Sequence, residues 1–115
     1  MEKHLYPAFT RAMAEKRAQL APEVHDAFQA FSTRVFAPGA LPAKMKQLIA
    51  VAVAHVTQCP YCIRGHTKQA LRQGATPEEV MEAIWVAAEM RAGGAYAHAA
   101  IAIEVMDEVE SKQHE

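Results

Sequence analysis

Two cysteines and a histidine within eight residues are the side chains best suited to chemistry. Cys59 and Cys62, the only two cysteines, are separated by Pro60 and Tyr61, and His66 follows four residues after the second. If Pro60 begins a helix, Cys59 is its N-cap and Cys62 lies in its first turn, where free N–H groups and the helix dipole favour a thiolate. One sulfur can then resolve an attack by the other, and His66 can move the proton near neutral pH. The pattern predicts thiol redox catalysis by Cys59, Cys62 and His66.

The same segment permits other interpretations. His55, Cys59, Cys62 and His66 have the ligand types of a Cys₂His₂ zinc site at a 4-3-4 spacing. Structural zinc usually joins separated segments of a chain, whereas these four residues lie within one segment of twelve residues and would constrain little of the fold. We therefore favour redox chemistry and expect no bound metal. A zinc-stabilised module without catalysis and a pair of inert, buried cysteines are the alternatives. Tyr61 is either a pocket residue near the sulfurs or a partly exposed packing residue.

A series of helices must position this segment. Apolar residues recur at intervals of three and four along most of the chain, and no strand pattern is present. This predicts an all-α fold, a single compact domain of about six helices. The predicted helices cover residues 9–20, 22–35, 42–58, 60–73, 77–92 and 95–110.

Punctuating residues set these boundaries. Thr76 and Glu79 form a capping box around Pro77, and Gly74 is suited to the left-handed position after a helix. Gly93-Gly94 is expected to interrupt the last helical pattern, and residues 111–115 are expected to fray.

Length and composition narrow the class of protein. With 115 residues, the chain fits one domain, residues 1–115, and the formal net charge of −1 disfavours nucleic-acid binding. The first residues lack the apolar region of a signal peptide, and the apolar run over 48–54 is too short to span a membrane. We therefore expect a soluble, cytoplasmic protein, a compartment in which paired cysteines are usually redox-active or metal-binding.

Three segments resemble the AhpD-like, alkylhydroperoxidase branch of the carboxymuconolactone decarboxylase superfamily. They are residues 46–55 (KQLIAVAVAH), 58–67 (QCPYCIRGHT) and 74–79 (GATPEE), within a similarity that covers residues 41–100. The resemblance implies an all-helical fold that forms trimers or hexamers and reduces hydroperoxides, or a partner's disulfide. The electron donor would be a dithiol, a peroxiredoxin or a lipoyl-type protein, with no cofactor beyond a redox-active Cys59–Cys62 disulfide.

The resemblance also assigns roles to single residues. In the family the second cysteine, here Cys62, becomes the sulfenic acid, and the first, here Cys59, resolves it to a disulfide. The helix-dipole argument, in contrast, activates Cys59 at least as well as Cys62. Which cysteine is attacked first therefore stays open from the sequence.

The histidine matches the family, but its relay partner does not. His66 would belong to a proton relay with a glutamate twelve residues before the first cysteine, and that position is Gln47 here. A neutral amide can orient an imidazole but cannot take up its proton at pH 7. His55 and Glu89 are the candidates for supplying the missing group. A decarboxylase or lactone-processing enzyme on the same fold, working through histidines, is a further alternative.

Overall fold

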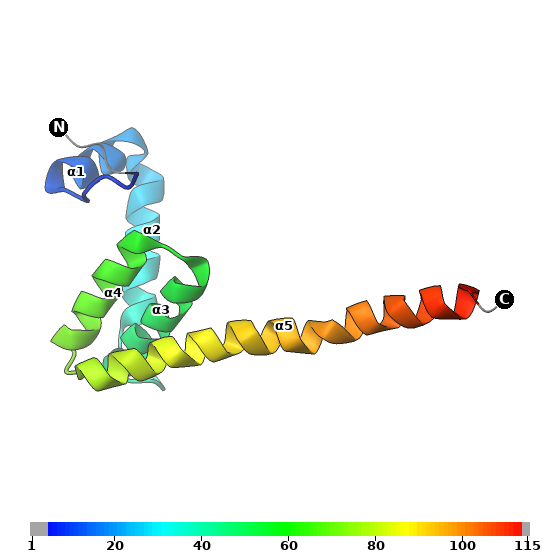
Figure 1. Ribbon diagram of the computed structural model, residues 1–115. Coiled ribbons are helices and arrows are strands. Elements are labelled where there is room, and N and C mark those ends of the chain that lie inside the picture. Colours follow the sequence, from blue (N-terminus) through cyan, green and yellow to red (C-terminus); the bar gives the residue numbers. More distant parts are fainter. Residues whose placement is uncertain (1–4, 114–115) are drawn as a thin grey trace.

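The computed structural model describes residues 5–113, which form five helices and no strand (Figure 1). The helices are α1 (Arg11–Leu20), α2 (Pro22–Phe36), α3 (Ala43–Thr57), α4 (Pro60–Arg72) and α5 (Pro77–Gln113). The all-α prediction is confirmed for this part of the chain.

The helix starts follow the proline and capping signals. Pro22, Pro60 and Pro77 each occupy the first position of a helix. The predicted capping box is present, because the Glu79 backbone N–H donates to Thr76 Oγ1 at 3.1 Å and the Thr76 N–H donates to Glu79 Oε1 at 2.9 Å. Gly74 has φ +93°, the left-handed conformation expected after α4.

The predicted interruption at Gly93-Gly94 is wrong. α5 runs unbroken through both glycines, so two predicted helices are one, and it continues to Gln113 where fraying was expected from residue 111 onward. Residues 114–115 lie outside the described part. Two glycines cost about 2 kcal/mol relative to alanine, whereas adding a residue to an existing helix avoids the nucleation cost. The alanine-rich sequence on both sides therefore carries the helix through.

α3 lies between α4 and α5 and forms the small core with them. Val51 on α3 is fully buried and packs with Ala70, Ala75 and Val80, while Leu48 and Ile84 close the cluster. The buried row of α3 is Gln47, Val51 and Ala54. A polar glutamine in that row requires a hydrogen-bond partner, which the site below supplies.

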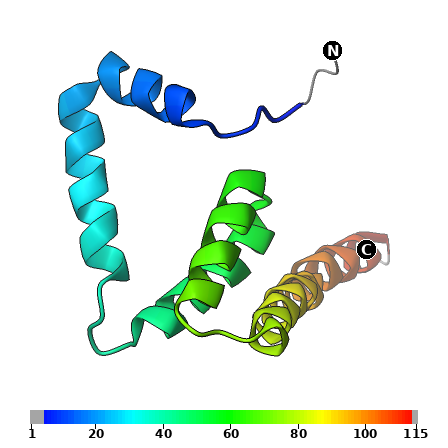
Figure 2. The same ribbon diagram turned by 90° about the vertical axis from the view of Figure 1, so that its left-hand side faces the viewer.

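The described chain is extended. Its radius of gyration is 20.7 Å, whereas a compact domain of this size has about 13 Å. α1 and α2 arch around the α3–α4 pair, and the second half of α5 projects away from every other helix (Figures 1 and 2). Within residues 5–113, no helix combines the length and apolar character needed to cross a membrane.

Candidate functional site

The two cysteines lie at the turn between α3 and α4. Gln58 ends α3 in the left-handed conformation, at φ 58° and ψ 45°, which reverses the chain so that α4 runs back along α3. Cys59 is the N-cap of α4, as predicted, and its Sγ accepts the backbone N–H of Cys62 at 3.3 Å. Both residues are free cysteines with half-buried side chains.

The environment makes the two thiols unequal. Hydrogen bonds from the Cys62 side chain and from the Cys62 backbone lower the pKa of Cys59. The pKa of Cys62 is raised, first because its hydrogen bond to Cys59 favours the protonated form, then by burial and by the Cys59 charge. Cys59 therefore ionises first, and the Cys62 thiol holds its proton against the Cys59 thiolate.

His66 is fixed in position by two residues from other helices. Its Nδ1–H donates to Oε1 of the buried Gln47 at 2.8 Å, and its ring stacks on Phe36 with ring centres 5.0 Å apart. Because Nδ1 carries the hydrogen, Nε2 is the basic nitrogen. Burial lowers the pKa of His66, so the imidazole is neutral and ready to accept a proton at neutral pH.

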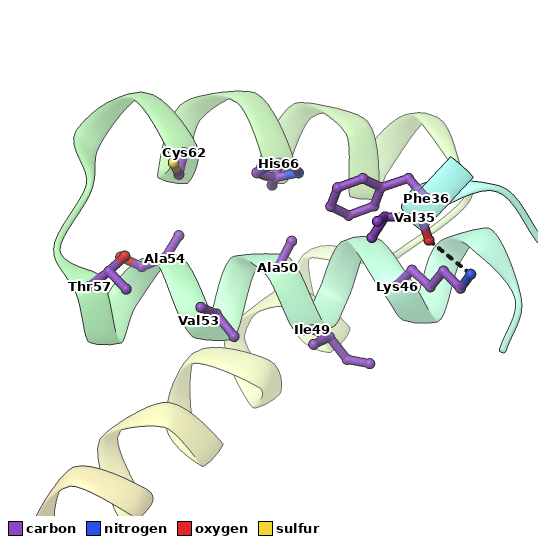
Figure 3. Close-up of a pocket in the computed structure, with 10 residues that line it drawn as sticks. All are labelled: Val35, Phe36, Lys46, Ile49, Ala50, Val53, Ala54, Thr57, Cys62 and His66. Atoms are coloured by element: carbon purple, nitrogen blue, oxygen red, sulfur yellow. Dashed lines mark hydrogen bonds between the residues drawn. The ribbon is translucent and has the colours of Figure 1, made fainter. Parts of the chain in front are cut away.

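Cys62 and His66 line an apolar cavity of about 370 Å³ between α2, α3 and α4. One face of α3 forms its floor, and α2 closes one side. The lining residues are Val35, Phe36, Lys46, Ile49, Ala50, Val53, Ala54, Thr57, Cys62 and His66. In Figure 3 Cys62 stands opposite Ala54, and His66 stands opposite Ala50. A thiol and a neutral base thus face the same open, largely apolar hollow.

The other candidates lie away from this cavity. His55 Nδ1 is 2.7 Å from the Val51 carbonyl oxygen of its own helix, and Glu89 is an exposed residue of α5. Neither lines the cavity. Of the three relay candidates, Gln47 is the one that hydrogen-bonds to His66.

Tyr61 was expected either in the pocket or as a packing residue, and the structure shows packing. Its hydroxyl donates to the Pro7 carbonyl at 2.7 Å, and its ring meets Tyr6 and Phe9 edge-on. It therefore holds the segment before α1 against the start of α4.

The four potential zinc ligands do not converge. Among residues 5–113, no three or more His, Cys, Asp or Glu side chains are arranged to hold a metal ion. His55 turns toward its own helix while His66 turns toward Gln47. The residues present therefore do not fit the zinc alternative.

Sequence reasoning missed Lys46 and Phe36 as parts of the site. Lys46 begins a stripe on α3 at intervals of three and four, so this face of the helix is visible in the sequence. Phe36 is the last residue of α2 and reaches His66 only through tertiary packing. No local signal identifies such a contact.

Comparisons with known proteins identify the family. Residues 22–104 match the model of the carboxymuconolactone decarboxylase family. A protein of Paracoccus denitrificans, described as uncharacterised protein 4 in the cox locus, is 60% identical over 104 residues, which are 90% of this chain and 93% of the relative. The chain therefore belongs to the carboxymuconolactone decarboxylase family.

Solved structures of other members share the fold. A family protein of Legionella pneumophila is 34% identical with a TM-score of 0.67, over 84% of this chain and 87% of that one. A Thermotoga maritima family protein, suggested to take part in an antioxidative response, is 27% identical with a TM-score of 0.56, over 77% of this chain and 92% of that one. These likenesses agree with the helical architecture described above.

Proposed function

We propose that this protein is a thiol-dependent peroxidase of the AhpD-like type, which reduces hydroperoxides through Cys59 and Cys62. The observation that carries the proposal is the cavity in which Cys62 and His66 face the same apolar space. Cys59 lies next to Cys62 at the helix start, where it can resolve the first reaction. The antioxidative role suggested for the Thermotoga relative points in the same direction.

We infer the order of steps from which sulfur faces the cavity. Cys62 lines it and Cys59 does not, so we assign the attack to Cys62 although Cys59 is the more acidic thiol. Cys62 gives its proton to His66 Nε2, and its sulfur attacks the distal oxygen of the hydroperoxide. The O–O bond breaks, Cys62 becomes a sulfenic acid, and the leaving alkoxide takes the proton from His66. The Cys59 thiolate then attacks the Cys62 sulfur, forming the disulfide and releasing hydroxide, which is protonated to water.

An electron donor must close the cycle. The disulfide accepts two electrons from a dithiol, which leaves as a disulfide, and both cysteines return to the reduced state. The donor we propose is a small dithiol, a lipoyl-type protein or a peroxiredoxin partner. Cys59 at the tip of α4 is the sulfur we expect the donor to attack, since Cys62 faces the cavity.

We also propose that the protein acts as a homo-oligomer, a trimer or a hexamer. α2 exposes Phe28 and Phe31 at 61% and 64%, and the free half of α5 exposes Ile101 and Met106 at 64% and 63%. Burying such side chains against other copies would contribute about 25 cal/mol per Å² of apolar surface. Light scattering on the purified protein would test this, and a monomer at micromolar concentration would contradict it.

The peroxidase proposal is tested by peroxide consumption with a dithiol donor. Cys62→Ser should abolish turnover. Cys59→Ser should still consume one equivalent of peroxide and leave a sulfenic acid at Cys62 that dimedone traps. Full activity in Cys62→Ser would refute the proposal. Conversion of a lactone by the double Cys→Ser variant would instead assign a decarboxylase-like activity.

A further inference from the structure

The cavity has a cation at the end away from the thiol. Lys46, Ala50 and Ala54 are successive residues of the α3 face that forms the floor. Cys62 stands opposite Ala54, while Lys46 lies at the far end of the stripe beyond Phe36 (Figure 3). The surface between these ends is almost entirely aliphatic or aromatic.

The Lys46 ammonium has one hydrogen left to donate. Nζ donates to the Val35 carbonyl at 2.9 Å and to the Ala37 carbonyl at 2.6 Å. An ammonium has three N–H donors, so these two acceptors, at the C-terminal end of α2, leave one free. None of the hydrogen bonds or ion pairs found within residues 5–113 joins a carboxylate to Lys46, so its charge is not neutralised there.

We propose that Lys46 is the carboxylate subsite of this cavity, and that the substrate is an aliphatic hydroperoxide with a carboxylate at its other end. The carboxylate accepts the free Lys46 N–H, the alkyl chain lies on the α3 face, and the hydroperoxide reaches Cys62. The claim that the bound hydroperoxide reacts at Cys62 rests on the proposed peroxidase function. The claim that Lys46 binds a carboxylate does not depend on it.

The α3 stripe also sets the length of the chain. Lys46 and Ala54, the residue opposite Cys62, are eight positions apart, which is about 12 Å along a helix axis. The Lys46 side chain extends further away from Cys62 (Figure 3), so this length is the shortest span the ligand must cover. A zigzag alkyl chain with C–C bonds of about 1.5 Å advances about 1.3 Å per bond, so about ten carbons cover that helix length. Shorter carboxylates would leave aliphatic surface uncovered, and their affinity should fall with each methylene removed.

Binding without peroxide is the first arm of the test. Titration calorimetry on the reduced protein would compare decanoate, octanoate and 1-octanol. We expect decanoate to bind more tightly than octanoate, and octanoate to bind on the order of tenfold more tightly than octanol, because a charge-assisted hydrogen bond is lost in the alcohol. Equal binding of octanoate and octanol, or no binding of either, would overturn the proposal.

Variants of Lys46 distinguish carboxylate binding from a purely structural role of this residue at the end of α2. Lys46→Gln should remove the preference for octanoate over octanol, and Lys46→Arg should keep most of it. Lys68→Gln, which removes an exposed lysine of α4 outside the cavity, should leave it unchanged. If Lys46→Gln weakens both ligands by the same factor, the residue only supports α2 and the proposal fails.

A kinetic arm connects the subsite to the reaction. The KM of a ten-carbon hydroperoxy acid should rise about tenfold in Lys46→Gln, while that of its methyl ester should stay nearly constant. Equal changes for acid and ester would contradict the proposal. Charge-selective binding without any peroxide turnover would refute the peroxidase function and leave the carboxylate subsite standing.

Discussion

Gln47→Glu is the substitution that tests the role of His66 most directly. Gln47 is 8% exposed, and its Oε1 accepts the His66 Nδ1–H at 2.8 Å. Glutamate has nearly the same shape, so the hydrogen bond is retained while a carboxylate replaces a neutral amide. We expect the pKa of His66, which burial lowers in the natural protein, to rise above its ordinary value.

The geometry gives the size of this effect. Charge centres about 4 Å apart attract by about 4 kcal/mol at the effective dielectric constant of a partly buried site. Desolvation of the new carboxylate offsets part of that energy. We therefore expect a rise of about one to two pKa units, equivalent to about 1.4 to 2.7 kcal/mol of added preference for the imidazolium.

The assay is a proton NMR titration of the His66 ring, assigned by the signal that disappears in His66→Gln. Gln47→Met is the matched control, because it removes the acceptor without adding charge and should leave the pKa lowered. The acid limb of peroxide turnover should move upward with the His66 pKa in Gln47→Glu. A His66 pKa that is unchanged or lower in Gln47→Glu would refute the reasoning.

The linked effect on stability has a defined sign. In the natural protein the unfolded chain binds more protons at His66 than the folded chain, so stability falls as pH drops below 6.5 toward the lowered pKa. In Gln47→Glu the folded pKa is the higher one, so the His66 contribution is present below 6.5 and is lost as pH rises through the raised pKa. Denaturant unfolding at several pH values would show the reversal, and identical pH slopes would count against it.

Three further predictions concern the helices and the second thiol. Cys59→Ser should lower the pKa of Cys62, because the hydrogen bond and the charge of Cys59 help to raise that pKa. Thiolate absorbance measured against pH would give the Cys62 pKa of the variant. A Cys62 pKa higher than in the unsubstituted protein would contradict the prediction. Gly94→Ala should stabilise α5 by about 0.5 to 1 kcal/mol in denaturant unfolding, since a new Cβ there meets no neighbour. Gly93→Ala should stabilise it less, because its Cβ would lie 3.2 Å from Glu89 Oε1. A larger gain from Gly93→Ala than from Gly94→Ala would show that this crowding is not decisive. Thr76→Ala should cost about 1 kcal/mol by removing the cap of α5, and an unchanged urea midpoint would argue against the cap's contribution.

Local chemistry made most of the fold predictable from the sequence. Three local features depend only on neighbouring residues: proline at the first helical position, the Thr76 capping box and the left-handed Gly74. They can therefore be recognised in the sequence without knowledge of the tertiary structure. The same holds for Cys59 as an N-cap, which depends only on where α4 begins. Continuity through Gly93-Gly94 was missed because it results from a balance summed over the whole of α5.

Contacts between helices could not be read from the sequence. The hydrogen bond from His66 to Gln47 requires one particular alignment of α4 along α3. The stacking of Phe36 on His66 requires that the end of α2 lies next to α4. Apolar periodicity also does not identify the buried face of α3, since Met45, Ile49 and Val56 follow the apolar pattern and are 44–46% exposed in the described chain. With apolar residues on several faces of one helix, periodicity does not decide which face meets which neighbour.

The hydrogen bond that makes Cys59 a helix cap has a consequence for the reduction potential of the pair. A thiolate accepts the Cys62 N–H strongly, whereas a neutral disulfide sulfur accepts it weakly, so the start of α4 is better satisfied in the dithiol form. Free energy that favours the dithiol makes the disulfide a stronger oxidant, by about 20 mV for each kcal/mol in a two-electron couple. The N-terminus of α4 thus favours reduction of the Cys59–Cys62 disulfide by the electron donor.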